Sequence, residues 1–350
     1  MQQVLTSVLI PSMLGSMTTD RRMPRQADIA RIAGVSQAAV SIVLGGKQSV
    51  RMAESTRQRI LEVAEELGYV PHPVAKRLAH SRSNLLGLYT FRTTFPTNEA
   101  DIYHPILSGV EAEAASLGQD LILFTGTSGP EARQEEAIRR TRMADGCLFF
   151  GREVPEAPVA RLVDAGFPLV YIGRRPELGG RIPYVGADYV TASAEVLERL
   201  IGLGHRKIRY VREPDEAPSS EDRLLGVLQA APDTEVVRLK GSELSVDALR
   251  SWLADGVTAL VVEGTDTGTA YRAVRTAVDA AGLSVPDDLS LAVLGVPPGV
   301  SGFEVPMREM GRHAVRLLIE LITNQETTPQ QLLWCPPVAG REVGPPRSTE

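Results

Sequence analysis

The spacing of apolar residues predicts a small helical unit near the N-terminus. Between residues 27 and 68, apolar positions recur every three or four residues in three successive stretches, the spacing of one buried helix face. Gly34, Gly45 and Gly68 each follow one stretch, where a glycine commonly ends a helix. Two short helices joined at a glycine, with a third helix over their shared apolar face, predict a helix-turn-helix unit.

From residue 85 onward the pattern changes to short, almost continuous apolar runs separated by helix-like stretches. Apolar strands that alternate with helices predict a parallel sheet buried on both faces, and so an α/β fold. The runs are more numerous than one sheet of five or six strands needs, which predicts two sheets. The predicted strands are residues 85–91, 121–124, 147–150, 169–172, 208–211, 259–262 and 289–294.

Charge is distributed unevenly between these two parts. The 350 residues carry a net charge of −6, which by itself disfavours nucleic-acid binding. Residues 24–82, however, contain nine Lys or Arg and five Asp or Glu, a net charge of +4, so the remainder carries −10. A basic segment attached to an acidic body indicates a nucleic-acid-binding arm.

The cysteines and the first residues of the chain indicate the cellular compartment of the protein. Cys147 and Cys335 are far apart and have no CxxC or Cys/His spacing, which disfavours a disulfide framework or a zinc site and fits a reducing cytosol. Residues 4–14 are largely apolar, but Pro11 interrupts them and no basic residue precedes them, unlike a signal peptide or a spanning helix. We expect a cytoplasmic protein whose residues 1–23 are a disordered arm or an over-long start, with Met17 or Met23 as the first residue.

Eight short stretches between residues 25 and 345 form a set of motifs: Asp28–Ser36, Ala39–Ser41, Thr56–Ile60, Glu66–Pro71, Ala75–Leu78, Leu203–Ile208, Arg223–Gly226 and Ala281–Ser290. In these motifs the chain resembles the LacI/GalR family of bacterial transcription regulators. The N-terminal motifs are specific as a set, whereas each motif of the body is weak alone.

The resemblance implies a homodimer whose body has the periplasmic-binding-protein fold, two Rossmann-like lobes with a small-molecule effector in the cleft. The expected organisation is a helix-turn-helix domain at 24–70, a hinge helix and linker at 71–84, and an effector-binding and dimerisation domain at 85–345. The chain is expected to cross between lobes near 173–182, 296–304 and 323–330. The implied function is a repressor of transcription that binds a palindromic DNA operator and responds to a small molecule, such as a carbohydrate or related metabolite.

Bases in a major groove are contacted by exposed side chains near the N-terminus of the second helix, here Gln37, Ala38 and Ile42. Gln37 can pair with adenine through two hydrogen bonds, whereas Ala38 and Ile42 offer apolar contact, for example to a thymine methyl group. Many relatives have a polar residue at Ile42, and the alternative is that this side chain packs inside the unit. The residues expected on phosphates are Ser36, which also suits an N-cap, Ser41, Arg51 and Arg57.

The hinge contributes Val74, Ala75 and Leu78 to the expected DNA contacts. Leu78 stands where the family inserts a leucine into the minor groove, a wedge that unstacks a base step. Its alternative role is to cap the body.

Candidate effector contacts lie where loops follow the strands of the body, because parallel-sheet lobes bind ligands at the carboxyl ends of their strands. Tyr103 suits stacking on a ring or a core position, and an arginine suits a clamp on a hydroxyl or carboxylate or simple solvation. Asp188 suits the N-cap of the following helix better, and Asp266 suits a ligand acceptor or a cap equally. The five candidates are Tyr103, Arg174, Asp188, Arg223 and Asp266.

One departure from the family concerns the segment Leu294-Gly295-Val296, where many relatives carry Phe-Asp-Asp. The missing aspartate argues against an ordinary sugar and leaves a less hydroxylated ligand, or a cleft that binds none and a regulator controlled by a protein partner. A solute-binding protein is a weaker alternative, given the basic helices. Because no GxGxxG after a strand, P-loop or GxSxG is present and the five histidines are scattered, we expect neither an enzyme nor a cofactor.

Overall fold

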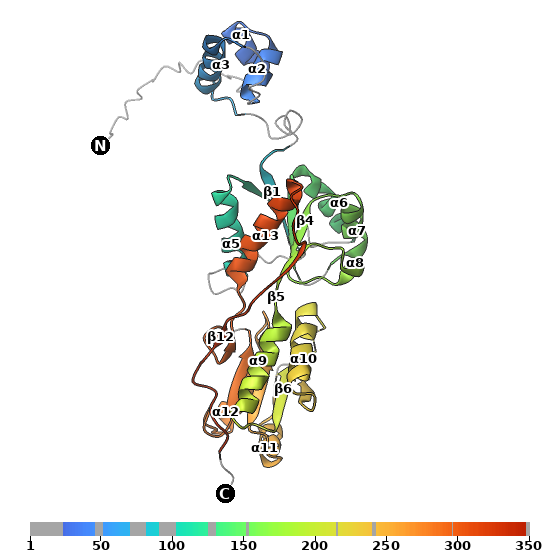
Figure 1. Ribbon diagram of the computed structural model, residues 1–350, viewed down its shortest axis with the longest axis vertical. Helices are drawn as coiled ribbons and strands as arrows, with labels where there is room; N and C mark the ends of the chain where they lie inside the picture. Colours follow the sequence, from blue (N-terminus) through green and yellow to red (C-terminus); the bar gives the residue numbers. More distant parts are fainter. Residues whose placement is uncertain are drawn as a thin grey trace, which may run out of the picture. The chain divides into compact units, whose positions relative to one another are not determined.

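The computed structural model describes residues 24–45, 52–70, 82–90, 103–124, 131–151, 154–214, 216–239, 243–295 and 297–347 (Figure 1). The chain divides into two compact units, Met1–Ser83 and Asn84–Glu350. They are described separately below as the N-terminal unit and the body. Among the described helices, none is long and apolar enough by itself to cross a membrane; the bent pair formed by the first two passes that test on length and composition only.

The described part of the N-terminal unit contains three helices: α1 Gln26–Ala33, α2 Gln37–Leu44 and α3 Glu54–Glu66. Gly34 ends α1 with φ +67°, a left-handed conformation that costs glycine little. The axes of α1 and α2 meet at 110°, an angle typical of a helix-turn-helix. The three helices share one core, made of Ile29, Ala30, Ala33, Val40, Val43, Ile60, Val63 and Ala64.

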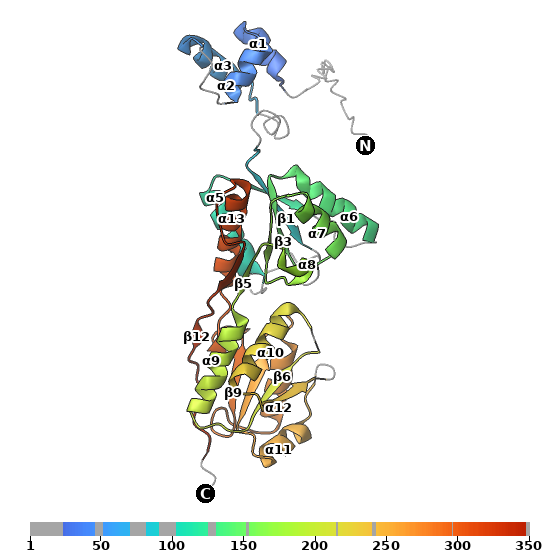
Figure 2. The ribbon, with the colours of Figure 1, turned by 45° about the vertical axis from the view of Figure 1, so that its right-hand side comes forward.

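The body contains two six-stranded sheets, which we call sheet A and sheet B. Sheet A has the order β11-β5-β4-β3-β1-β2 and is parallel throughout. Its helices α5 His104–Ser116 and α13 Met307–Ile322 cover one face, and α6 Glu131–Arg140 and α7 Glu156–Asp164 cover the other (Figure 2). Its strands are β1 Leu85–Thr90, β2 Asp120–Phe124, β3 Gly146–Phe150, β4 Leu169–Ile172, β5 Tyr184–Ala187 and β11 Gln330–Leu333.

Sheet B repeats this order as β12-β10-β9-β8-β6-β7, with only β12 antiparallel to its neighbour. Helices α9 Tyr189–Gly202 and α10 Pro218–Ala230 pack on one face, and α11 Val246–Ala254 and α12 Thr269–Ala280 on the other. Its strands are β6 Ile208–Arg212, β7 Glu235–Arg238, β8 Ala259–Glu263, β9 Ser290–Leu294, β10 Gly302–Phe303 and β12 Pro337–Val338. Short helical turns at Thr141–Met143 and α8 Glu177–Gly180 complete the lobe of sheet A.

Two lobes with the same parallel strand order confirm the predicted fold class, a helical unit followed by a two-lobed α/β body. In each sheet the first strand lies second from the edge, so that the chain reverses direction beside it. Ligands of such sheets bind where the order reverses, at the carboxyl ends of the strands.

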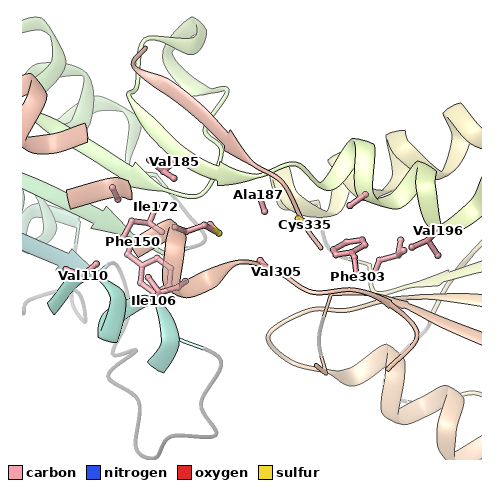
Figure 3. Close-up of a cluster of buried hydrophobic side chains, with 14 of the residues drawn as sticks. Ile106, Val110, Phe150, Ile172, Val185, Ala187, Val196, Phe303, Val305 and Cys335 are labelled. Carbon is pink, nitrogen blue, oxygen red and sulfur yellow. The ribbon is translucent and has the colours of Figure 1, made fainter. Parts of the chain in front are cut away.

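Three segments cross between the lobes, and they lie later in the chain than predicted. The chain leaves sheet A between Ala187 and Tyr189, returns between Phe303 and Met307, and leaves again between Leu333 and Pro337. The prediction of 173–182, 296–304 and 323–330 was wrong because the short strands β5, β10 and β11 extend each lobe first. Figure 3 shows Ala187, Val305 and Cys335 of these segments lying between the two lobes.

Candidate functional site

The N-terminus of α2 is the exposed end of the helix-turn-helix. Ser36 caps the helix by accepting a hydrogen bond from the Ala39 backbone N–H at 3.2 Å. Gln37 and Ala38 follow on the surface and are exposed, whereas Ser41 and Ile42 are half-buried. Ile42 is not among the residues that form the shared core of the unit. The N-terminal turn of α2 therefore presents an amide and small side chains to solvent.

Arg57 lies in the first turns of α3, half-buried, with its Nε 4.0 Å from a carboxylate oxygen of Glu54. An exposed ion pair of this length contributes little to stability, so the guanidinium can exchange Glu54 for a phosphate at small cost. The other expected DNA contacts, Arg51, Val74, Ala75 and Leu78, lie outside the described residues.

A cavity of about 140 Å³ lies between the two lobes of the body, at the carboxyl ends of the strands. The lobe of sheet A supplies aromatic and aliphatic side chains, and the lobe of sheet B supplies most of the polar ones. The residues that line it include Tyr103, Ile106, Phe150, Ile172, Arg175, Tyr189, Ser219, Ser220, Arg223, Thr265, Asp266, Val305 and Met310. Three of the five predicted effector contacts are therefore brought together: Tyr103, Arg223 and Asp266.

Tyr103 and Asp266 meet across this cavity. The Tyr103 hydroxyl donates a hydrogen bond of 2.6 Å to Asp266, which joins the lobe of sheet A to that of sheet B. The Tyr103 ring packs edge-on against Phe150, with 4.8 Å between centroids. Tyr103 thus combines a core contact with a polar group that faces the cavity.

Arg174 makes the second polar contact between the lobes, but it does not line the cavity. Its Nε and Nη2 each donate a hydrogen bond of 2.6 Å to the carboxylate of Asp222 in α10. Such a two-point arginine–carboxylate contact is among the stronger polar interactions in proteins. Asp222, which the sequence analysis did not single out, is thus the partner that holds Arg174.

Arg223 is buried, and its guanidinium is occupied by backbone carbonyls. It donates to Leu294 at 2.8 Å, Ser219 at 2.9 Å and Gly264 at 3.0 Å, and it lies 3.9 Å above the Tyr189 ring. These bonds tie together the ends of β8, β9 and the start of α10. With these contacts, Arg223 holds the ends of these elements in place at the cavity wall.

Gly295, where the resemblance places an aspartate in many relatives, lies tightly against this arginine. Its φ is +120°, and a Cβ at this position would lie 3.2 Å from Arg223 Nη2 and 3.2 Å from the Gly264 carbonyl oxygen. A side chain at Gly295 would therefore press on the guanidinium that holds the wall.

Asp188 does not line the cavity. Its carboxylate caps α9 by accepting a hydrogen bond from the Thr191 N–H at 3.1 Å. Asp188 is therefore the N-cap of α9 rather than a residue of the cavity.

A buried polar network supports the cavity from sheet B. Glu213 accepts hydrogen bonds from the hydroxyls of Thr265 at 2.8 Å and Thr267 at 2.6 Å, and Glu263 accepts one from the Glu213 N–H at 3.0 Å. The network fixes the loop that carries Thr265 and Asp266. Burial raises the pKa of the Tyr189 hydroxyl in the same wall, so this group remains a neutral donor.

Comparison with known proteins places both units in one family. Residues 27–72 match the model of bacterial regulatory proteins of the lacI family, and residues 197–342 match that of a periplasmic binding protein-like domain. An HTH-type transcriptional regulator from Streptomyces limosus is 31% identical over 344 residues, covering 91% of this chain and 94% of that protein. The HTH-type transcriptional regulator CelR of Thermobifida fusca is 29% identical over 347 residues, covering 93% of this chain and 99% of the relative.

Solved structures of transcription regulators have the same fold. A CelR–cellobiose complex is 25% identical, with a TM-score of 0.59 over 91% of this chain and all of that one. The lac repressor dimer bound to operator and an anti-inducer is 20% identical, with a TM-score of 0.70 over 92% of this chain and 99% of that one.

Proposed function

The chain belongs to the LacI family of bacterial regulatory proteins and is a DNA-binding transcription regulator, and we propose that it is a cytoplasmic, homodimeric repressor governed by a small molecule in the interlobe cavity. Members of this family regulate transcription and are not enzymes. The observation that carries the proposal is the combination of a helix-turn-helix unit with a lined cavity between two lobes in one chain.

On DNA, the N-terminus of α2 enters the major groove. Gln37 pairs with a base, Ala38 and Ile42 contact base edges through apolar atoms, and Ser36, Ser41, Arg51 and Arg57 bind phosphates. The exposure of Gln37 and Ala38 supports this arrangement, as does the weak hold of Glu54 on Arg57. The operator is a palindrome, because a two-fold dimer presents two such helices.

The hinge adds Val74, Ala75 and Leu78, with Leu78 as a wedge in the minor groove between the half-sites. Replacing Leu78 by alanine removes the wedge, so Leu78→Ala should weaken operator binding while the unfolding transition of the body is unchanged. A mobility-shift titration and a thermal melt measure the two effects. Equal operator affinity in both proteins would assign Leu78 to the alternative role of capping the body.

The dimer forms through the edge of sheet A. Strand β2 is an edge strand, and its Leu121 and Leu123 are 38% and 39% exposed on one side. Neighbouring Leu117, 42% exposed, enlarges this apolar surface. Apolar side chains on a sheet edge favour association with a second copy, so Leu123→Glu should shift sedimentation toward the monomer.

The effector occupies the cavity between Tyr103, Arg223 and Asp266. The position of the cavity at the carboxyl ends of both sheets supports this assignment. The printed description of the CelR relative names a cellobiose complex, which makes a carbohydrate or a related metabolite the first class to test. Closure of the lobes around the effector moves the lobe of sheet A and changes the order of the hinge.

Control by a protein partner is the second candidate, and the polar contacts between the lobes favour it. Tyr103–Asp266 and Arg174–Asp222 join the lobes through hydrogen bonds of 2.6 Å. A body closed in this way can serve as a rigid surface for another protein.

One experiment separates the two candidates. Binding of the purified protein to the DNA upstream of its own gene is measured by fluorescence anisotropy while a panel of sugars and sugar derivatives is added. A metabolite that changes the operator affinity supports small-molecule control. An operator affinity that no metabolite changes, but that a cell extract does, would support a protein partner instead.

A further inference from the structure

The interlobe cavity contains a second arginine that neither the predicted contacts nor the comparisons assign. Arg175 follows β4, lines the cavity and is only 6% exposed. Its guanidinium lies 4.1 Å above the Tyr171 ring, and its Nη2 donates to the Gly151 carbonyl oxygen. The Tyr171 hydroxyl donates to the same oxygen at 2.7 Å, so the ring and the carbonyl hold the arginine in one position.

This fixed guanidinium lacks a counter-charge. Among the described residues no carboxylate forms an ion pair with Arg175, and its Nε is buried without a hydrogen-bond partner. Arginine is rarely this buried unless it is paired, and a buried polar atom without a partner carries a desolvation cost. A binding site that awaits a ligand group accounts for such an atom.

The rest of the cavity does not neutralise the charge. Arg223 is a second cation of the lining, and it too is held by carbonyl oxygens. Asp266 is the only carboxylate among the described lining residues, and the Tyr103 hydroxyl binds it. Two guanidinium groups and one carboxylate leave the lined space with a positive charge, which favours an anion.

The remaining walls limit the size and character of the ligand. Ile106, Phe150, Ile172 and Val305 are apolar residues of the lining, and Figure 3 shows the first three close together. The volume of about 140 Å³ is close to that of a cavity known to accommodate benzene, room for roughly six heavy atoms in the present arrangement of the lobes. A compact ligand with one charged end and few hydroxyls fits both walls.

We propose that the effector of this cavity is a small organic anion whose single carboxylate or phosphate group binds Arg175. The inference rests on the proposed sensing function and adds the chemical class of the effector. The guanidinium of Arg175, held against Tyr171 at the cavity wall, supplies the positive charge that balances the ligand. The apolar side around Phe150 then contacts the uncharged part of the molecule.

Matched pairs of acid and neutral compounds test the proposal by calorimetry and thermal shift at constant ionic strength. The probes are D-glycerate against glycerol and L-lactate against 1,2-propanediol, with inorganic phosphate as a further anion. We expect at least one acid or phosphate to bind in the millimolar range or better and its neutral partner to bind at least about tenfold more weakly.

Two variants locate the charge. Arg175→Gln should weaken binding of that acid about tenfold to a hundredfold, the usual loss for a charge-assisted hydrogen bond. Arg181→Gln is the matched control, because Arg181 is an exposed arginine of the same lobe that pairs with Asp164 and lies outside the cavity. If Arg175→Gln fails to fold, Arg175→Lys retains the charge and should keep the preference for the acid.

The result that overturns the proposal is any one of three: a neutral partner that binds as tightly as its acid, an acid that binds Arg175→Gln as tightly as the unaltered protein, or no binding of any acid up to about 10 mM. Operator binding in the same preparations distinguishes this failure from that of the sensing function. If a neutral sugar changes the operator affinity, the proposed sensing function stands and the proposal of an anionic effector fails. If no compound changes the operator affinity, the result contradicts the sensing function as well as the anionic effector.

Discussion

A single glycine sets the geometry of Arg223 in the wall of the cavity. Gly295→Ala should destabilise the body by about 1–3 kcal/mol, because it combines a strained φ of +120° with pressure on the guanidinium. Gly299→Ala is the control, since Gly299 also has a positive φ, +81°, but nothing lies within 4 Å of its Cβ position. Urea unfolding measures both. Equal losses would mean that backbone strain alone matters and that Arg223 adds nothing.

Substitutions of Gln37 and Arg57 should change DNA binding in different ways. Gln37→Ala should reduce the favourable free energy of operator binding by about 1–3 kcal/mol and relax the sequence preference at one base position.

Arg57→Ala should weaken binding to all duplexes equally and lower the slope of log affinity against log salt by about one. Titrations of operator and scrambled duplexes at several salt concentrations measure both changes. A Gln37→Ala protein that loses affinity equally for both duplexes would remove Gln37 from base recognition.

The sequence predicts site residues only where position in the chain reveals them. Tyr103 precedes α5 and Asp266 follows β8, whereas Arg223 lies in the second turn of α10, and the structure places all three at the cavity. Asp222 lies inside a helix, and its role depends on Arg174 in the other lobe, a contact that no local pattern records. Arg175 resembles any exposed arginine in the sequence, and only its burial against Tyr171 distinguishes it.

At the scale of elements, Glu113 joins α5 to α13. Its carboxylate accepts hydrogen bonds from Arg316 Nε at 2.7 Å and Arg312 Nε at 2.9 Å, and the residue is only 5% exposed. The hydrogen bond from Arg316, followed by that from Arg312, lowers the pKa of Glu113 below its ordinary value. The ionised carboxylate is therefore the form that stabilises the folded protein.

Glu113→Gln should lower stability by about 1–3 kcal/mol at neutral pH, the cost of removing a charged hydrogen-bond partner. Because the pKa is lowered on folding, the contribution is complete above the ordinary carboxyl value and is lost as pH falls through the folded-state pKa. The difference between the two proteins should shrink in acid. Glu309→Gln, which affects a half-exposed partner of Arg312, should change stability little at any pH. A difference that stays constant down to pH 3 would contradict this account.

Most of the strands that the pattern predicted are buried on both faces, and the exception is β2, an edge strand with exposed leucines. Strands β1, β3, β4, β8 and β9 are near-continuous apolar runs in the interior of each sheet. Five strands were not predicted: β5 has four residues including a glycine, β10 and β12 have two residues each, β7 lies at an edge with exposed ends, and β11 begins with two glutamines. Their pairing depends on neighbouring strands rather than on their own residues, and the misplaced lobe crossings follow from this.

At the scale of the whole body, the Tyr103–Asp266 and Arg174–Asp222 contacts join the two lobes among the described residues. Asp222→Asn removes the negative charge that pairs with Arg174, so the lobes should separate more often. Small-angle scattering of the ligand-free protein should then give a larger radius of gyration. Asp164→Asn is the control, because it breaks an exposed pair with Arg181 within one lobe. An unchanged radius in Asp222→Asn would mean that apolar contacts at the three crossings suffice to keep the lobes closed.

We assign DNA binding to the N-terminal unit and effector binding to the body, and this assignment depends on the uneven distribution of charge along the chain. Residues 24–82 carry a net charge of +4 in a chain of −6, so the N-terminal unit attracts phosphates that the body repels. The measurement that tests this most directly is an anisotropy titration of the duplex upstream of its own gene across a range of salt concentrations, for the full chain and for residues 84–350. The account predicts tight, sequence-dependent binding that weakens steeply with salt for the full chain, and none for the body alone. Equal affinity for operator and scrambled duplex, or binding by the body alone, would contradict it.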